Sequence, residues 1–382
     1  MKNRFYKVTL FTTIVAVCLM NFGMAAAADS DVKLPKMMHW SCYDVGAGAY
    51  IQTSAIADGL LKKYGVKVRL MPTGSDTSRI LAMKTKRVEM TFLGNGAYFA
   101  SEGLYDFSTY EWGPQDLRCV IAPPATHCLY TTNTSGVKDV KDLKGRRVAW
   151  VIGSPSLNVK TTGYLAFGNL TWDDVEKVEF ASFGASLNGL IEGSVDAIGG
   201  TTKGGIIKAA ASPKGAHLLE LYANDTEGWA RLKKHAPFLK AVKESKGIDI
   251  EENHPKDVAQ QRFPMAITYA DADADLIYNF LKGVHQSYDV YKNSHQNMPN
   301  WEIHLAGSTP ADVPFHEGAV RYLKEIGVWT AEDQAWNDAR LEHLKKVQAA
   351  WENALDKAQE QKIKSNDFPE FWVKERAKAL GE

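Results

Sequence analysis

The sequence predicts an α/β fold organised as two similar lobes that face one another. Two observations carry this prediction. Short apolar runs alternate with stretches of helical periodicity, and a loop of small residues separates each run from the stretch that follows it. This unit occurs three times over residues 40–103 and three times again over residues 147–211. Because strands that alternate with helices form sheets flanked by helices, each set predicts a mostly parallel sheet in its own lobe.

The first set of units places three loops at one edge of its predicted sheet. These loops span residues 44–48, 72–76 and 94–96. Each loop lies where a strand ends and a helix begins, so free helix N–H groups and the positive end of a helix dipole point at that edge. Such an edge suits a small anion.

The second set repeats this arrangement without evident sequence identity to the first. Its loops span residues 153–156, 182–185 and 199–202. The chain is predicted to cross between the lobes near residues 121–130 and 263–269. We therefore assign residues 29–125 and 265–330 to lobe one and residues 126–264 to lobe two. A ligand is expected between the two loop edges, because domain interfaces commonly hold small-molecule sites.

The N-terminus predicts a secretory signal peptide over residues 1–28. A basic start, with Lys2, Arg4 and Lys7, precedes an apolar stretch that is too short to span a membrane comfortably. Four alanines, Ala25 to Ala28, then offer small residues at a cleavage site. An uncleaved anchor is the alternative interpretation. We expect export to the periplasm as a soluble protein.

Charge and composition exclude several classes of function. Lysine and arginine together number 45, as do aspartate and glutamate, so the formal net charge is zero and gives no electrostatic footprint for nucleic acid. No GxSxG or HExxH motif is present, and the ten histidines are scattered, so we do not expect an enzyme. No zinc or EF-hand spacing occurs, so neither a metal nor a cofactor is expected.

Three cysteines, Cys42, Cys119 and Cys128, remain once the signal peptide is removed. An odd number cannot pair fully within one chain. Cys119 and Cys128 could form a disulfide in an oxidising compartment, or each could be an isolated buried thiol. The sequence leaves both alternatives open.

The region after the second set is mostly helical and ends in a helical extension over residues 331–382. Residues 213–262 are polar and give no clear sheet signal. In the extension, offsets of three and four connect Leu341, Leu344, Val347, Trp351 and Leu355. A strict heptad would put Gln348 in the seam, so we expect an amphipathic helix that docks across the back of lobe one rather than a coiled coil. This favours a monomer over a homodimer, with a final docked turn near residues 369–372.

Several polar and aromatic residues of the loop edges could contact a ligand or serve only the fold. Hydroxyls that can either cap a helix or bind are those of Ser75, Ser154, Ser156 and Thr201. Arg79 lies one turn into its helix and could clamp a carboxylate with two hydrogen bonds, or be a surface residue. Tyr50, Tyr98 and Phe183 could wall the ligand or pack the core. Gly46 and Gly48 lack the GxGxxG spacing, so nucleotide binding is not expected.

A set of short motifs carries a resemblance to a known family. The motifs are Gly46-Ala47-Gly48-Ala49-Tyr50, Pro72-Thr73-Gly74-Ser75, Asn95-Gly96-Ala97-Tyr98, the segment 142–148 followed by Gly153-Ser154, Val195-Asp196-Ala197-Ile198, and the segment 314–329, which is the most specific. Over residues 38–329 the chain resembles the TAXI solute receptors, which are periplasmic binding components of TRAP transporters. It departs from them at the ligand edge, at Tyr43-Asp44, at the single Gly74, at Gly94-Asn95 and at Pro155.

The resemblance implies a two-lobed periplasmic binding protein of the type II-like fold. Such a protein would close on a small organic anion (a carboxylate, dicarboxylate or acidic amino acid) and deliver it to a TRAP permease driven by an ion gradient. Alternatives on the same fold are an exported enzyme and a sensory ligand-binding module. The matching site positions are Gly46, Gly48, Tyr50, Thr73, Ser75, Asn95, Tyr98, Ser154, Ser156 and Thr201, to which residue chemistry adds Arg79.

Overall fold

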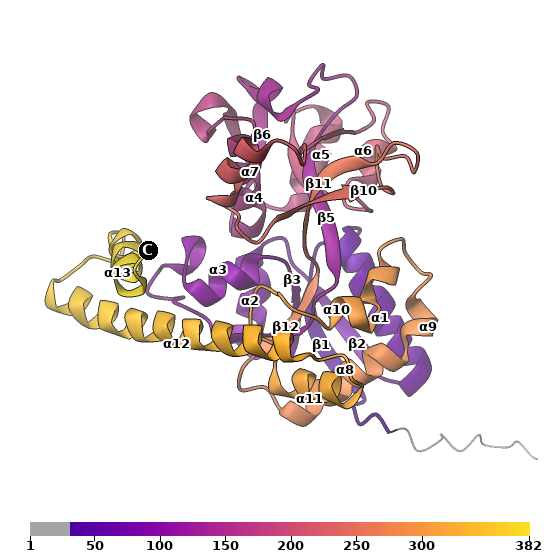
Figure 1. Cartoon of the computed structure of the whole chain (residues 1–382), viewed down its shortest axis with the longest axis vertical. Helices are drawn as coiled ribbons and strands as arrows, with labels where there is room; N and C mark the ends of the chain where they lie inside the picture. The colour runs from indigo at the N-terminus through magenta and orange to yellow at the C-terminus, as the bar shows by residue number, and fades with distance from the viewer. Residues whose placement is uncertain (1–30) are drawn as a thin grey trace, which may run out of the picture. The chain divides into compact units, whose positions relative to one another are not determined.

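The computed structural model describes residues 31–382, of which Val32–Glu382 form one compact unit. The predicted signal peptide, residues 1–28, lies outside the described residues. Two α/β lobes make up this unit, lobe one below and lobe two above in Figure 1, and a long C-terminal helix runs along lobe one. The predicted two-lobed α/β architecture is therefore confirmed. None of the described helices combines the length and the apolar composition that crossing a bilayer requires.

Lobe one is built on a five-stranded sheet with the order β2-β1-β3-β12-β4. The strands are β1 (Met37–Cys42), β2 (Lys67–Pro72), β3 (Met90–Leu93), β4 (Leu117–Ile121) and β12 (Met265–Tyr269). Strand β1 runs parallel to β2 and β3, whereas β12 runs antiparallel to β3 and β4. The helices of this lobe are α1 (Gly48–Tyr64), α2 (Asp76–Lys84), α3 (Gly96–Glu102), α8 (Ala274–Gln286), α9 (Tyr288–Tyr291), α10 (Ile303–Ala306) and α11 (Glu317–Glu325).

Lobe two contains a sheet with the order β10-β11-β5-β8, and β9 also pairs with β5. Its strands are β5 (Pro124–Thr131), β8 (Ile198–Thr201), β9 (His217–Leu219), β10 (Lys240–Glu244) and β11 (Lys256–Arg262). A separate parallel pair consists of β6 (Arg147–Val151) and β7 (Glu176–Phe180). The helices are α4 (Pro155–Phe167), α5 (Phe183–Glu192), α6 (Ile207–Ala210) and α7 (Thr226–Lys233).

The direction of the strands differs from the mostly parallel sheets that the sequence predicts. The pairings of β5 with β8, β9 and β11, and that of β10 with β11, are all antiparallel. Strands β9, β10 and β11 lie in the polar stretch 213–262, where no strand was expected. The signal of β10 is weak because it is a short, largely exposed edge strand of the sequence KAVKE, which needs no apolar run. The sequence of β11, KDVAQQR, is mostly polar although most of its residues are buried.

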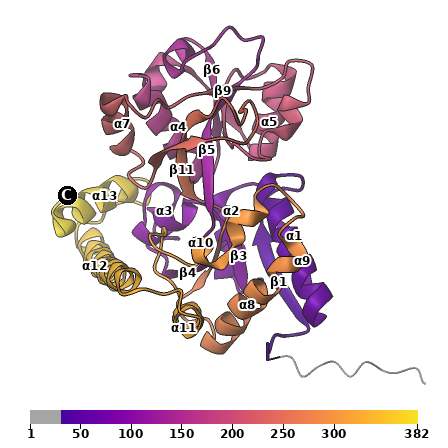
Figure 2. The same ribbon diagram turned by 45° about the vertical axis from the view of Figure 1, so that its right-hand side comes forward.

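The chain passes between the lobes twice, at neighbouring places. Strand β4 ends at Ile121 and β5 begins at Pro124, while β11 ends at Arg262 and β12 begins at Met265. Figure 2 shows β5 and β11 side by side where they lead from one lobe into the other. These paired strands are therefore the connection about which we predict the lobes to rotate.

Aromatic packing fixes helix α8 on the sheet of lobe one. Trp40 of β1 lies with its ring centroid 5.2 Å from that of Phe92 and 5.4 Å from that of Phe280 in α8. All three side chains are fully buried. Because removal of such a ring costs about 3–5 kcal/mol, this cluster is a major source of stability for the lobe.

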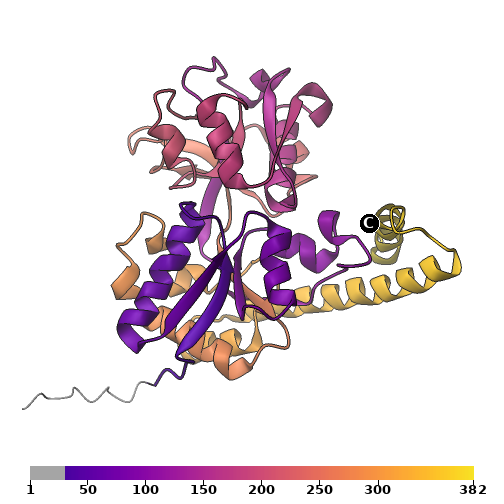
Figure 3. The same ribbon diagram turned by 180° about the vertical axis from the view of Figure 1, so that it is seen from behind.

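The C-terminal extension consists of helices α12 (Ala331–Glu360) and α13 (Phe368–Leu380). Helix α12 begins at a capping box between Thr330 and Asp333, and it leaves lobe one as a long rod in Figure 3. Leu344, Val347 and Trp351 are buried within the single chain, as predicted. The prediction of a final turn near residues 369–372 is wrong, because these residues belong to helix α13. Pro369 stands in the first turn of this helix, where proline is well accommodated.

The three cysteines of the described chain are buried and unpaired. Cys42 lies in β1, Cys119 in β4 and Cys128 in β5. Of the two alternatives for Cys119 and Cys128, the structure contains the isolated buried thiols.

Candidate functional site between the lobes

A cavity of about 40 Å³ lies between the loop edges of the two lobes. The residues that line it include Tyr43, Ala47, Gly48, His127, Ser156, Lys160, Phe183, Thr201 and Phe263. One water molecule needs about 10–15 Å³ of such space, so the cavity has room for a few water molecules or a small ligand.

Lys160 brings an unpaired positive charge to this cavity. Its side chain is 2% exposed, and its ammonium donates a hydrogen bond to Gln261 Oε1 at 2.8 Å. Across residues 31–382 no carboxylate forms an ion pair with it. Burial lowers the pKa of Lys160 to about 8, although the charges of Asp76 and Asp312 act in the opposite direction. The ammonium is therefore charged at neutral pH, and an anion would complete its coordination.

His127 lines the same cavity as a neutral group. Its ring is 2% exposed, and Nδ1 lies 2.9 Å from the hydroxyl of Tyr164. Burial, together with the positive charge of Lys160, lowers the pKa of His127 well below its ordinary value. The imidazole is consequently uncharged at pH 7 and can offer hydrogen bonds but no second positive charge.

The N-terminus of helix α1 adds backbone donors to the cavity wall. Ala47 is the N-cap residue, and no side chain caps the helix at this end. A methyl group added at Gly48 would lie 3.4 Å from backbone atoms of Gly204 and Gly205 in lobe two, so the two loop edges approach closely here. Free N–H groups and the helix dipole both favour a negative charge at this position.

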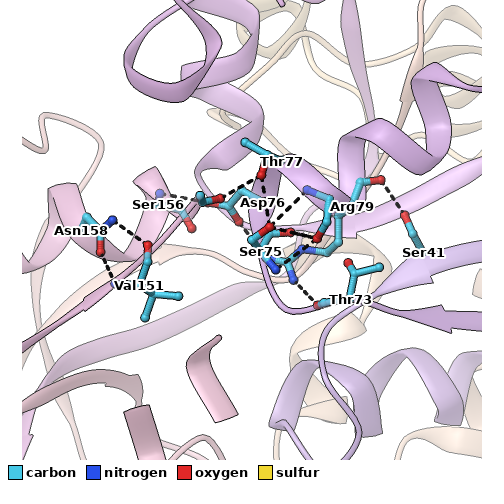
Figure 4. A network of polar contacts seen from close by, with 11 residues as sticks. Ser41, Thr73, Ser75, Asp76, Thr77, Arg79, Val151, Ser156 and Asn158 are labelled. Carbon is cyan, nitrogen blue, oxygen red and sulfur yellow. Dashed lines mark hydrogen bonds and ion pairs between the residues drawn. The ribbon is translucent and has the colours of Figure 1, made fainter. Parts of the chain in front are cut away.

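The N-terminus of helix α4 is occupied by a carboxylate of the protein itself (Figure 4). Asp76, which is fully buried in lobe one, accepts a hydrogen bond on Oδ2 from the backbone N–H of Ser156 at 3.0 Å. A second connection runs from the N–H of Thr77 to the carbonyl oxygen of Gly153 at 3.2 Å. The two lobes are thus joined by direct hydrogen bonds beside the cavity, and we call this pair of contacts the interlobe clasp.

Arg79 is part of the same network and is not free to clamp a ligand. Its Nη2 lies 2.8 Å from Asp76 Oδ1, and its Nη1 donates to the carbonyl oxygen of Thr73 at 2.8 Å. The guanidinium stacks over the ring of Tyr43 at 3.8 Å and is 2% exposed. The sequence left open that Arg79 binds the carboxylate of a ligand. In this structure the carboxylate that Arg79 binds is that of Asp76.

The structure brings some predicted site residues to the cavity and places others elsewhere. Gly48, Ser156 and Thr201 line it. Gly46, in a left-handed conformation, lies in the loop before α1, and Ser75 caps α2. Ser154 and Thr73 are close to the clasp, and their buried hydroxyls have no hydrogen-bond partner. Tyr50 packs against the core of lobe one.

Asn95 is the N-cap residue of α3, and Tyr98 lies within this helix. Both contact other parts of the protein. Asn95 donates to Asp312 Oδ2 at 2.9 Å, and burial raises the pKa of Asp312 to about 6. The ring of Tyr98 lies against Phe238 of lobe two and below the guanidinium of Arg340 at 4.9 Å. Neither residue lines the cavity.

Sequence reasoning missed the two nitrogen-bearing side chains of the cavity, His127 and Lys160. Lys160 follows Ser156 by four residues, so both lie on one face of α4, and this spacing could have revealed it. His127 gives no such signal, because it stands in an apolar strand. In the part of the chain that is described, no three His, Cys, Asp or Glu side chains gather as a metal site.

Solved structures with a related arrangement have low sequence identity and TM-scores below 0.5. The alkanesulfonate-binding protein SsuA from Xanthomonas axonopodis pv. citri, bound to MOPS, is 16% identical, with 87% of this chain and 95% of that chain covered and a TM-score of 0.45. A periplasmic binding protein from Brucella ovis with glutathione bound is 10% identical, with 66% and 68% covered and a TM-score of 0.43. The aliphatic sulphonate binding protein SsuA from Escherichia coli is 15% identical, with 84% and 88% covered and a TM-score of 0.39.

At the level of sequence, no curated protein matches the chain. The family model described as the NMT1-like family matches residues 45–327, which include lobe two, lobe one except strand β1, and every residue of the cavity named above except Tyr43. This match extends over more than half of the chain, and the protein therefore belongs to the NMT1-like family.

Proposed function

We propose that the protein is a periplasmic solute-binding protein that captures a small organic anion between its lobes and delivers it to a TRAP permease. The observation that carries the anion is Lys160, a buried ammonium with one neutral partner at the wall of an interlobe cavity. The resemblance to TAXI receptors supports the permease and the periplasmic location. The same resemblance, and the absence of catalytic motifs, support a carrier that releases its ligand unchanged.

In this proposal the ligand anion lies between Lys160 and the N-terminus of α1. Gly48, Ser156 and Thr201, which line the cavity from both lobes, contact the ligand directly. Because these residues belong to both lobes, a bound ligand stabilises the closed form over the open one. The protein acts as a monomer, since the apolar face of α12 is already buried within the chain.

The proposal is tested by thermal shift with the chain from residue 29 onward and a panel of carboxylates, sulfonates, sugars and amines. A ligand that binds only the folded state raises the melting temperature. We expect shifts from carboxylates in the parent protein and in Lys234→Gln, whose exposed lysine lies in the same lobe. Lys160→Met, which keeps the length of the side chain without its charge, should remain folded and show no shift.

Two further measurements separate a carrier from the alternatives. Mass spectrometry of the ligand after incubation should find it unchanged, whereas turnover would establish an enzyme instead. Uptake of the ligand by cells that carry the partner TRAP permease should stop when the ion gradient is dissipated. Uptake that depends on ATP rather than on the gradient would contradict the TRAP assignment.

A further inference from the structure

We infer that the cleft selects ligands with one negative charge over ligands with two, and that Asp76 sets this preference by filling a second anion-binding position. The inference rests on the proposed function and specifies its ligand as a small monoanion with an apolar body. Three groups of contacts support it: the charges at the cavity, the environment of the Asp76 carboxylate, and the aromatic walls.

The residues that line the cavity carry one positive charge for a ligand to neutralise. Among the cavity-lining residues that the structure describes, Lys160 is the only cation, because His127 is neutral. Arg79 lies next to the cavity behind Tyr43, but Asp76 neutralises it at 2.8 Å. One ligand carboxylate therefore neutralises the charge of Lys160, and a second carboxylate would bring an excess negative charge into a buried space.

The groups around Asp76 form a complete carboxylate-binding position. One oxygen of Asp76 is held by the guanidinium of Arg79, and the other is held by the first turn of α4 through Ser156 N–H. A guanidinium and a helix N-terminus are the partners that a second ligand carboxylate would seek. Since the side chain of Asp76 already satisfies both, a dianion meets a fixed negative charge where it needs a positive one.

Aromatic rings form the remaining walls and favour an apolar ligand body. Tyr43 and Phe263 meet edge to face with their ring centroids 5.2 Å apart, and Phe183 lines the cavity from lobe two. The Lys160 ammonium is 6.0 Å from the centroid of Phe263, so a carboxylate at Lys160 places its carbon chain beside these rings. The cavity of about 40 Å³ limits that chain to a few atoms.

The test uses three probes of similar size: propionate, malonate and malonamate, the monoamide of malonate. Isothermal titration of the parent protein should give tighter binding of propionate and malonamate than of malonate, by at least about tenfold, the scale expected for like-charge repulsion. This comparison needs no mutant, so it remains decisive if a variant fails to fold. Malonate binding as tightly as malonamate would overturn the inference.

The variant Asp76→Asn tests the role of the residue. It keeps the shape of the side chain but removes its charge, so the ratio of malonate to propionate affinity should rise by at least about tenfold. The control Asp116→Asn changes an exposed carboxylate of the same lobe and should leave the ratio as it is. An unchanged ratio in folded Asp76→Asn would overturn the assignment of Asp76. If no anion of any charge binds the folded parent protein, the proposed function itself fails.

Discussion

The carboxylate of Asp76 and the backbone N–H of Ser156 are 3.0 Å apart, so a buried side chain of lobe one lies on the first turn of a helix in lobe two. Arg79 holds the other oxygen of this carboxylate, which fixes the orientation of the Asp76 side chain. It joins the lobes beside the cavity, where a ligand bound as proposed would also contact both lobes. In the proposed function, closure of the lobes and ligand binding therefore depend on the same part of the molecule.

Weakening the Asp76–Ser156 contact of the interlobe clasp should favour the open form of the molecule. A hydrogen bond to a charged group contributes about 1.5–3 kcal/mol, so Asp76→Asn should shift the closed-to-open ratio by roughly 10- to 100-fold. Small-angle scattering without ligand should then give a larger radius of gyration for Asp76→Asn than for the parent protein. Asp116→Asn, which alters an exposed ion pair, should match the parent. Equal radii for all three proteins would show that the clasp does not hold the lobes together.

The stability of the protein should depend on the protonation of Lys160. The pKa of Lys160 is about 8 in the folded protein, below its ordinary value of 10.5, so the unfolded chain binds more protons between these values. The free energy of unfolding therefore gains up to about 3 kcal/mol from this group as the pH rises from about 8 to 10.5. Chemical denaturation at pH 7.5 and 10 should reveal this gain as the difference between the parent protein and Lys160→Met.

The same proton controls ligand affinity. In the proposed function the charged ammonium binds the anion and the neutral amine does not, so the affinity for the anion should fall as the pH rises above about 8. Isothermal titration at pH 7 and 9.5 measures the fall. An affinity that is the same at both pH values would remove Lys160 from the anion site.

A buried carboxylate in lobe one should hold the C-terminal extension in place. Glu102 of α3 is fully buried, and its oxygens lie 2.6 Å from Arg340 and 3.0 Å from His343 of α12. A second arginine, Arg376 of α13, is 2.5 Å away. Glu102→Gln leaves the two arginines without their anion and should lower the free energy of unfolding by about 3–5 kcal/mol. Glu342→Gln, at an exposed position of α12, serves as the control.

The pH dependence of this contact has a definite sign. Burial alone would raise the pKa of Glu102, but the hydrogen bond from His343 and the charges of the arginines outweigh burial and hold the pKa at about 2. Its stabilisation is present above the ordinary pKa of 4.5 and is lost as the pH falls from 4.5 toward 2. Acid unfolding followed by circular dichroism should therefore be less steep in Glu102→Gln. Identical acid transitions would contradict the role of Glu102.

The buried thiols should be unreactive in the folded protein. Cys42, Cys119 and Cys128 are all buried and unpaired, and burial raises the pKa of each thiol. A thiol reagent should modify none of them in the native chain from residue 29 onward, and all three after denaturation. Fewer than three reactive thiols in the denatured, unreduced protein would show that a disulfide forms.

The periodicity of the sequence is sufficient to predict the alternation of strands and helices. The loops at residues 44–48 and 153–156 do lie at the ends of strands that precede helices. The start of α12 at Thr330 and the burial of Val347 were also predictable, since capping and helical spacing are local properties. The strands β10 and β11 were not, because their polar residues carry no apolar pattern.

The chemistry of the site was decided by tertiary structure. Asp76 and Arg79 are three residues apart in one helix, so their pairing is a local event that the sequence could indicate. The contact of Asp76 with Ser156, 80 residues away, depends on how the lobes meet. A single lysine in a helix gives no sign of burial in the sequence. Lys160 is buried only in the folded chain, where its ammonium contacts Gln261, 101 residues away. Local sequence specifies helices and caps, whereas burial and charge pairing across lobes depend on the whole fold, and these decide which cation is left for a ligand.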